Sequence, residues 1–390
     1  MTESRQSKAP QPPDWTELTD LACCSVGGCV IFATDEWFAP SHRMLLESSP
    51  IFNDEFTPYG KWMDGWESRR KRLPGHDWCI IKLGLPGRIH GIEIDTAFFT
   101  GNQAPSASVQ AAWLDPEPAS LLQLGVQWKS DRIGKAAVAD ELRRAEEVGS
   151  QDWVQIVPVS PLKPGYNNGR RNFFAVQHNE PVTHLRLNMY PDGGIARLRV
   201  PGVVERSWDR VPIDQEVDLV SAENGGIAIG CSDCHFGEPR NLIKPGRGVN
   251  MGDGWETARK PTRPPVVVLG EDGLVQASGS DWAVLKMGVV GEVTRLVLDT
   301  NHFKGNFPQS FSVEGCLAPA ATKEVCEGGI TWKLLMPRTR AGPDREHTME
   351  LAKGDLLVTG PLSHLKLSIF PDGGVMRLRA YGHRALRCKL

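Results

Sequence analysis

Apolar residues recur at every second position in many short stretches of the chain. The stretch 184–190 reads His-Leu-Arg-Leu-Asn-Met-Tyr, and the stretches 364–370, 92–94 and 196–200 alternate in the same way. Turns that contain Pro and Gly separate these runs. Short alternating runs between such turns are typical of antiparallel strands that bury one face. The pattern therefore predicts a mostly β fold.

Long motifs occur twice in the same order. The motif at 184–200 returns at 364–380, an offset of 364 − 184 = 180. Asp64-Gly-Trp-Glu67 returns as Asp253-Gly-Trp-Glu256 at an offset of 189, and Gly101-Asn102 returns at an offset of 204. A period this long indicates a duplicated domain rather than a solenoid. We therefore expect an all-β chain of two tandem jelly-roll β-sandwich domains.

The duplication also predicts the domain boundaries. The expected segments are a flexible N-terminal segment (1–19), the first repeat (20–204), a linker (205–217), the second repeat (218–383) and a C-terminal tail (384–390).

One insertion distinguishes the first copy. The offset between matching motifs of the two copies falls from 204 to 180. This fall places the insertion between Trp113 and Trp153. Apolar positions 138, 142, 145 and 148 follow helical spacing there, and Gly149 marks a stop. We expect one short helix in this insertion.

Two features of the repeated motif carry structural expectations. Pro191-Asp-Gly-Gly194 separates two alternating stretches, and Pro followed by Gly suits a hairpin turn. Arg197 and Arg199 alternate with apolar residues, as Arg377 and Arg379 do in the second copy. This alternation favours a solvated sheet face or ion pairs between the domains.

Composition narrows the class of partner. The chain has 44 Lys and Arg against 47 Asp and Glu, a net charge of −3, whereas nucleic acids and anionic membranes attract basic surfaces. No stretch approaches the ~20 apolar residues that span a bilayer. Nine cysteines, an odd number, without an apolar N-terminal signal are typical of reduced intracellular thiols. We expect neither nucleic acid nor a membrane as partner.

The segment 60–72 is the first candidate site, because it combines charged and aromatic residues around the repeated Asp-Gly-Trp-Glu core. Trp is costly to expose, and Arg can hold a carboxylate through two parallel hydrogen bonds. A purely structural charged turn is the alternative. The candidate ligand-binding residues of this segment and its second copy are Trp66, Arg69, Arg70, Trp255 and Arg259.

A second candidate lies where an alternating strand ends in an acid and a Gly-Asn turn follows. This order suits either strand termination or a site at a loop mouth. His302 occupies the position of Phe98, and a lone His is more often structural. The candidate acid–base residues are Asp64, Glu67, Asp95, Asp253, Glu256, Asp299 and His302, and the candidate amide-binding residues are Asn102 and Asn306.

Common cofactor motifs are absent from the sequence. It contains no P-loop, no G-x-G-x-x-G after a strand and no H-E-x-x-H. Cys231 and Cys234 form a lone C-x-x-C without a second pair at metal spacing, which favours ordinary thiols. We expect no metal and no cofactor.

The combination of motifs resembles the allantoicase family. The resemblance spans about Gly27 to Gly382 and rests on segments 32–35, 61–67, 75–78, 95–102 and 299–307, with both Pro-Asp-Gly-Gly turns. It implies tandem jelly rolls similar to galactose-binding sandwiches, in a homo-oligomer. It also implies a hydrolase of C–N bonds in linear amidines, which converts allantoate and water to ureidoglycolate and urea. The residue roles proposed above come from side-chain chemistry.

The implied reaction can be compared with the candidate residues. Allantoate carries a carboxylate and two ureido groups on one carbon, so its hydrolysis needs a cation, a general acid and a general base. Arg69 or Arg70 suits the carboxylate, and Asn102 and Asn306 suit the ureido groups. The alternatives are a non-catalytic tandem sandwich that binds a small ligand or carbohydrate, and an inactive allantoicase homologue.

The last three residues are Cys388-Lys389-Leu390. They resemble the Ser-Lys-Leu peroxisomal address, which an import receptor reads. We expect a peroxisomal protein with that receptor as a partner, and otherwise a cytoplasmic one.

Overall fold

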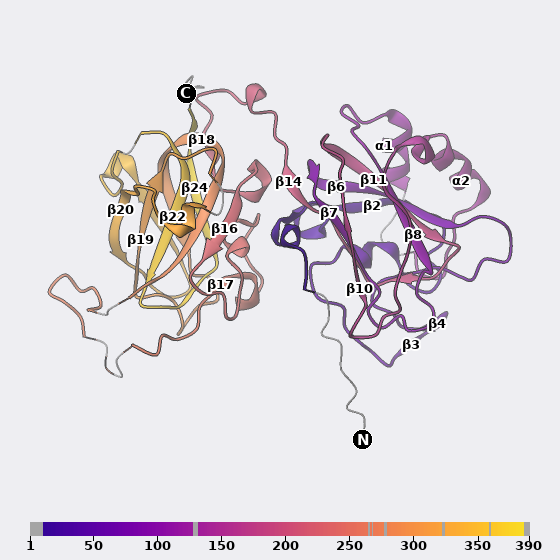
Figure 1. Cartoon of the computed structure of the whole chain (residues 1–390), viewed down its shortest axis with the longest axis horizontal. Helices are drawn as coiled ribbons and strands as arrows, with labels where there is room; N and C mark the ends of the chain where they lie inside the picture. Colours follow the sequence, from indigo (N-terminus) through magenta and orange to yellow (C-terminus); the bar gives the residue numbers. More distant parts are fainter. Residues whose placement is uncertain are drawn as a thin grey trace. The chain divides into compact units, whose positions relative to one another are not determined.

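The computed structural model describes residues 11–127, 132–263, 266, 268–276, 279–321, 324–358 and 360–385. The chain divides into two compact units: unit 1 ends at Glu205, and unit 2 begins at Arg206 (Figure 1). Each unit is built mostly of antiparallel strands around its own apolar core. This architecture confirms the predicted all-β fold of two tandem jelly-roll β-sandwiches that arose by duplication.

Unit 1 contains one large and one small sheet. The order in the large sheet is β1 (Thr19–Asp20), β14 (Pro201–Val204), β6 (Asp77–Ile89), β11 (Val182–Tyr190), β8 (Ser106–Ala112) and β9 (Val154–Pro161), with β2 (Cys29–Ala33) also paired to β6. The small sheet contains β10 (Arg171–Ala175), β7 (Gly91–Asp95) and β13 (Arg197–Arg199). Further strand pairs are β5 (Trp66–Glu67) with β12 (Gly194–Ile195), and β3 (Phe56–Thr57) with β4 (Gly60–Lys61).

Strand alternation places the core of unit 1 between the two sheets. Leu185 and Leu187 of β11 share one buried cluster with Ile94 of β7 and Leu198 of β13. Because side chains alternate along a strand, Arg186 and Asn188 lie on the opposite face of the large sheet. The predicted period of two is therefore correct, and it leaves polar residues on the outer face.

The insertion of unit 1 contains two helices, α1 (Ala119–Gln127) and α2 (Ala139–Glu146). Leu121, Leu124 and Ala145 from these helices pack on Trp78 and other apolar residues of the outer sheet face. The prediction of a helix is right for α2, but the prediction of only one is wrong. The apolar run of α1 is too short for its period to separate helix from strand.

The predicted hairpin at 191–194 is also wrong. β11, which precedes the turn, pairs with β6 and β8 of the large sheet. β12 and β13, which follow it, pair with β5 and β7. The turn therefore carries the chain from one sheet to another, and Pro and Gly suit such a reversal as well as a hairpin.

Unit 2 repeats this plan. Its large sheet has the order β15 (Val217–Asp218), β24 (Arg377–Arg384), β18 (Asp281–Asp299), β22 (Leu362–Phe370), β19 (Ser310–Cys316) and β20 (Lys333–Arg340), with β16 (Ile227–Cys231) and β21 (Glu346–Glu350) paired to β18. The remaining elements are the pair β17 (Trp255–Glu256) and β23 (Gly374–Val375), and the helix α3 (Glu324–Glu327). β18 replaces both β6 and β7 by a single 19-residue strand.

Short 3-10 helices connect many of the strands. In unit 1 they are Asp14–Glu17, Cys24–Val26, Ser41–Leu45 and Ser150–Asp152. In unit 2 they are Trp208–Arg210, Ala222–Asn224, Pro239–Ile243, Met251–Asp253 and Leu351–Lys353.

Parts of the expected N-terminal segment and linker pack onto the units. The ring of Trp15 meets that of Phe173 with centroids 6.0 Å apart. Val211 is buried in the core of unit 2. Among the described residues, no helix has the length and apolar character needed to cross a membrane.

Candidate functional site

Asp64 lies directly before β5 and forms a buried ion pair with Arg197 of β13. Arg197 Nη2 and Nη1 lie 2.7 and 3.2 Å from the two carboxylate oxygens of Asp64. The backbone N–H of Ile51 donates a third hydrogen bond to this carboxylate. Arg197 therefore does not lie on a solvated face or between domains, because a buried guanidinium needs a partner within its own unit. Partners within unit 1 thus occupy both carboxylate oxygens of Asp64, and its catalytic role stays a prediction.

The two tryptophans of the Asp-Gly-Trp-Glu cores are fully buried. Trp66 donates from Nε1 to the Asp35 carbonyl, and Trp255 donates in the same way to the Asp233 carbonyl. Both rings belong to apolar cores and are 0% exposed. Their predicted contact with a ligand is wrong, because the burial that a large indole favours leaves no surface for a ligand.

Glu67 and Asn102 form the most distinctive polar pair of unit 1. Asn102 Nδ2 donates to Glu67 Oε1 at 2.6 Å. Burial raises the pKa of Glu67 to about 7, while the Asn102 hydrogen bond opposes the rise. A buried carboxyl that titrates near neutral pH suits a general acid. The structure thus brings together an acid and an amide that the sequence analysis selected separately.

Asp95 ends β7 and is 5% exposed. Its Oδ1 accepts a hydrogen bond from the Ala97 N–H, and Arg170 Nε lies 3.8 Å away. Burial raises the pKa of Asp95, and Arg170 lowers it by a smaller amount. Phe98, close by, has a positive φ of 67°, as does its counterpart His302. Such backbone geometry is rare for bulky residues, and it often marks functional sites.

The second-copy residues have different partners. The Asp253 carboxylate accepts hydrogen bonds from the N–H groups of Val249 and Asn250, and Arg377 donates to the backbone carbonyls of Asp253 and Gly246. Asn306 donates to Glu256, as Asn102 does to Glu67. The Asn–Glu pair therefore occurs in both units.

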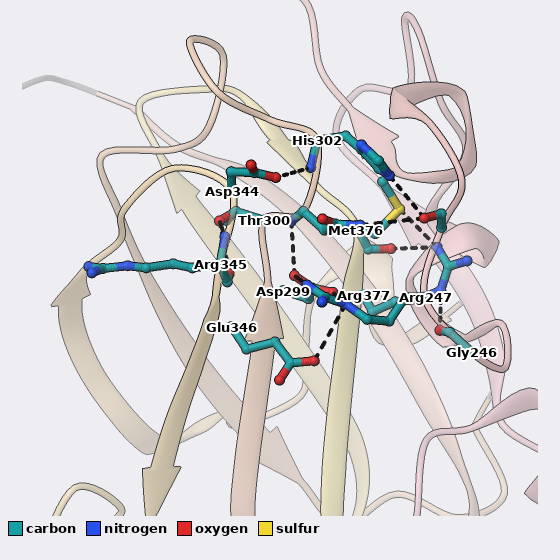
Figure 2. Close-up of polar contacts among 12 residues, drawn as sticks. Gly246, Arg247, Asp299, Thr300, His302, Asp344, Arg345, Glu346, Met376 and Arg377 are labelled. Atoms are coloured by element: carbon teal, nitrogen blue, oxygen red, sulfur yellow. Dashed lines mark hydrogen bonds and ion pairs between the residues drawn. The ribbon is translucent and has the colours of Figure 1, made fainter.

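Asp299 is neutralised by a residue that the sequence analysis missed. Arg247 Nε and Nη2 lie 3.0 and 3.1 Å from its two carboxylate oxygens. Figure 2 shows that Arg247 also reaches toward Glu346, at 3.7 Å. Ser49 of the first copy is equivalent to Arg247. The residue before each of them, Ser48 or Gly246, accepts a hydrogen bond through its carbonyl from the Nε of the equivalent arginine, Arg197 or Arg377.

His302 lies near this ion pair. Its backbone N–H donates to Asp344 Oδ1 at 2.8 Å, and its Nε2 lies 3.0 Å from the Gly248 carbonyl (Figure 2). A carbonyl only accepts, so Nε2 carries the proton in this contact.

The candidate arginines differ in their surroundings. Arg69 binds Asp35 through its Nε at 2.8 Å and stacks over the Trp37 ring at 4.4 Å. Its counterpart in unit 2 is Ala258, since the backbone N–H of each donates to an equivalent aspartate. Arg70 and its counterpart Arg259 are exposed, with no hydrogen bond or ion pair to any described residue.

Lys71 and Lys260 form a network that occurs in both units. Lys71 Nζ binds Asp77 Oδ1 at 2.7 Å, and its backbone N–H donates to Asp192. Lys260 makes the same contacts with Asp281 and Asp372. The basic run 69–72 therefore contributes a structural lysine that the sequence analysis missed, and its presence in both copies was a signal that could have found it.

A longer loop distinguishes unit 1 at this edge. Ile51 and Val249 are equivalent, since each N–H binds the aspartate of the repeated core, and their offset is 198. The offset falls to 189 between Asp64 and Asp253. Unit 1 therefore has 198 − 189 = 9 more residues between Ile51 and Asp64 than unit 2 has between Val249 and Asp253. This loop includes β3 and β4, and it exposes Phe52 and Phe56. Phe52 lies 5.8 Å from Phe98, ring centroid to ring centroid.

The described part of the chain contains no group of three or more His, Cys, Asp or Glu side chains arranged to hold a metal ion. The predicted tail residues Cys388, Lys389 and Leu390 lie outside the described residues.

Comparisons with known proteins agree with the resemblance found in the sequence. The family model described as "Allantoicase repeat" matches residues 19–205 and 217–385. A Stutzerimonas stutzeri protein named "Probable allantoicase" is 40% identical over 371 residues, which cover 94% of this chain and 96% of the relative. A Pseudomonas fluorescens protein of the same name is 38% identical over 368 residues, with the same coverage.

A solved structure extends the agreement to the fold. The crystal structure of allantoicase from Saccharomyces cerevisiae has a TM-score of 0.67 and 35% identity to this chain, and the match covers 94% of this chain and 93% of that one. The matched repeats correspond to the two sandwich units in number and order. We conclude that this chain belongs to the allantoicase family.

Proposed function

We propose that the chain hydrolyses allantoate to ureidoglycolate and urea, with the general acid in unit 1. Membership of the allantoicase family supports the reaction. The observation that carries the assignment of the acid is the buried Glu67 carboxyl, whose pKa is raised to about 7 and which binds Asn102.

The reaction breaks one C–N bond and forms one C–O bond. Glu67 donates a proton to the nitrogen that leaves with urea, while the lone pair of the other ureido nitrogen forms a C=N bond to the central carbon. Water then adds to this carbon, and a carboxylate accepts its proton. Each general acid or base of this kind contributes about 10²–10⁴-fold in rate. Asn102 supplies an amide that can hydrogen-bond a ureido group.

The contrast between Asp95 and Asp299 supports unit 1 as the catalytic copy. Arg247 binds Asp299 with two hydrogen bonds, which occupy both carboxylate oxygens. Asp95 accepts a hydrogen bond from the Ala97 N–H and has the Arg170 Nε 3.8 Å away, and burial raises its pKa. Asp95 is the proposed base for water. Asp253, Glu256, Asp299 and His302 then belong to a copy that does not turn over substrate.

Arg70 is the candidate cation for the substrate carboxylate within segment 60–72. It is exposed and makes no ion pair with a described residue, whereas Arg69 is already engaged by Asp35. Arg259 is the matching residue of the second copy.

The test of the reaction is urea release by the purified full-length chain supplied with allantoate. Glu67→Gln should lower kcat by about 10²–10⁴-fold, and Glu256→Gln is the matched control in unit 2, which should retain most activity. Urea release by wild-type protein that does not exceed the spontaneous rate would disprove the reaction. Equal losses in the two variants would disprove the assignment to unit 1.

We also propose that the chain forms a homo-oligomer. Exposed apolar side chains on the longer loop of unit 1 support this, with Phe52 59% and Phe56 75% exposed. Contiguous exposed apolar groups often mark protein interfaces. Light scattering of the purified chain tests the proposal, and a monomeric mass at micromolar concentration would contradict it.

The tail Cys388-Lys389-Leu390 is the proposed peroxisomal address. A fluorescent protein ending in these three residues should enter peroxisomes, and the same protein without the final Leu should stay in the cytoplasm. Identical distributions would contradict the assignment.

A further inference from the structure

A buried arginine lies on the outer face of the large sheet of unit 1, away from the residues considered so far. Arg186 of β11 is 6% exposed, and its guanidinium lies 3.8 Å from the ring centroid of Trp78. Its Nε donates to Asn188 Oδ1 at 2.9 Å, and its Nη1 donates to Ser150 Oγ at 2.8 Å. These contacts fix the orientation of the guanidinium.

No carboxylate of the described residues lies within ion-pair distance of Arg186. A guanidinium has five N–H donors, and the two hydrogen bonds to side chains leave three without an acceptor among the described residues. Burial lowers the pKa of Arg186, because the charge has lost its water. Burying a charge without a counter-ion is costly, and a bound anion would offset this cost.

Unit 2 shows how the same position is neutralised. Lys366 corresponds to Arg186, and its cross-strand neighbour Glu314 corresponds to Gln110. Lys366 Nζ lies 3.4 Å from Glu314 Oε2. The duplicated sheets therefore differ at one cross-strand pair: unit 2 supplies an internal carboxylate, and unit 1 supplies a neutral amide.

The hydrogen-bond network around Asn188 determines the protonation of His76. Arg186 can only donate, so the atom of Asn188 that it contacts is the carbonyl oxygen Oδ1. His76 Nε2 contacts the same oxygen at 3.0 Å and therefore carries a proton. Burial lowers the pKa of His76, which favours the neutral ring. Its Nδ1 is then an acceptor with no hydrogen-bond partner among the described residues.

The other groups of this face complete a polar surface. Asn188 Nδ2 donates to Gln110 Oε1 and to Ser108 Oγ, which also contacts the Tyr190 hydroxyl. His76, Gln110 and Tyr190 are half-buried, so the group reaches solvent through them. In unit 2, Ser280, Ser368 and Phe370 stand at the positions of His76, Asn188 and Tyr190.

We propose that Arg186, Asn188 and His76 form a binding site in unit 1 for a small carboxylate that carries ureido or amide N–H groups. The carboxylate meets the free N–H groups of Arg186, and a ligand N–H donates to His76 Nδ1. The need for an anion follows from the unpaired guanidinium alone. The choice of a ureido acid rests on the proposed function.

The test is calorimetric titration of the full-length chain with N-carbamoylglycine, which has one carboxylate and one ureido group. Arg186→Gln should weaken binding about tenfold or more, because a charge-assisted hydrogen bond pair is lost. Lys366→Gln, the matched variant of unit 2, should bind the probe as tightly as the wild type. The neutral amide of N-carbamoylglycine should bind the wild type weakly. Its affinity should be about that of N-carbamoylglycine itself for Arg186→Gln.

A second variant tests the site if Arg186→Gln does not fold. Gln110→Glu places in unit 1 the carboxylate that unit 2 has at Glu314, so it should pair with Arg186, raise the melting temperature and remove the part of the probe's binding that Arg186→Gln also removes. Glu314→Gln should leave binding unchanged. Any of three results would overturn the proposal. Gln110→Glu binds the probe as tightly as the wild type, the wild type binds the charged probe and its neutral amide equally, or the wild type does not bind the probe.

The two proposals fail separately. Arg186-dependent binding of the probe by a chain that releases no urea from allantoate would remove the proposed reaction and support the site. The opposite result is that the wild type releases urea from allantoate, while Gln110→Glu leaves the affinity for the probe unchanged. This result would support the reaction and overturn the site.

Discussion

Arg197 and Asp64 form a bidentate ion pair in which the side chains are only 2% and 7% exposed. The carboxylate of the equivalent Asp253 accepts hydrogen bonds from two backbone N–H groups. The repeated Asp-Gly-Trp-Glu core therefore keeps the aspartate, and in both units an N–H of the preceding loop binds its carboxylate. In unit 1 this aspartate helps to hold β13 against the segment before β5.

Asp64→Asn should destabilise the chain. Removing one partner of a buried ion pair leaves the other charge uncompensated, at a cost of about 3 kcal/mol. Asp253→Asn weakens two backbone hydrogen bonds at a half-buried site, so it should cost less, about 1 kcal/mol. Urea denaturation of the two variants gives these values. A stable but inactive Asp64→Asn protein would mean that Asp64 is catalytic after all.

Proton donation by Glu67 predicts a falling alkaline limb in the pH profile. The acid must be protonated to act, so kcat/KM for allantoate should decrease tenfold per pH unit above about pH 7, the pKa of Glu67. Glu67→Gln should remove this limb along with most activity. Asp95 must be charged to accept a proton, so the acidic limb should lie above the ordinary Asp pKa of about 3.9. A flat profile between pH 6 and pH 9 would contradict the role of Glu67.

The same carboxyl predicts a pH-dependent stability. The folded-state pKa of Glu67 is raised from about 4.5 to about 7, so folding favours the protonated form. Its contribution is complete below pH 4.5 and is lost as the pH rises through 7, by on the order of 2–3 kcal/mol. Glu67→Gln should therefore gain stability relative to wild type between pH 5 and pH 8, measured by denaturation at each pH. Glu256→Gln serves as the control, and equal curves for the Glu67 variant and wild type would refute the shift.

Exchanging one residue between the units tests the proposal that the Arg247–Asp299 pair keeps unit 2 from catalysis. Ser49→Arg places an arginine in unit 1 where Arg247 stands in unit 2, and it should pair with Asp95 as Arg247 pairs with Asp299. The expected result is a large loss of kcat with little change in melting temperature, because the new residue is on the surface. Ser49→Gln controls for side-chain size. Full activity of Ser49→Arg would show that Asp95 need not be free.

Repetition and alternation account for what the sequence predicted well. The period of two located strands such as β11, and the duplicated motifs located the two sandwiches. The spacing of Leu142 and Ala145 identified α2, whereas Leu122, Leu124 and Val126 in α1 recur at every second position and give no helical period. The turn at 191–194 was misassigned because strand pairing, which decides between a hairpin and a crossing between sheets, depends on contacts distant in sequence.

The candidate site was harder to predict, because burial and partners decide the role of a polar residue. Glu67 and Asn102 are 35 residues apart, and only the fold joins them. Trp66 has the composition of a ligand contact but fills the core. Arg247 escaped notice because the first copy has Ser there. Arg186 lies inside the repeated motif, where it resembles an ordinary strand residue. It stands out only when it is compared with its counterpart Lys366, which has the carboxylate of Glu314 as a partner, whereas Arg186 has none at ion-pair distance among the described residues.

The lysine network shared by the two units gives a relative chronology. Lys71 and Lys260 make the same three-way connection to two aspartates in each unit, so a single-copy ancestor already contained it before the gene was doubled. Arg247 and the carboxylate of Glu314 occur in one half only, so the two halves diverged at these positions after the doubling. Exchanging the residues at these positions between the halves would measure how far the two copies have separated since they were one module.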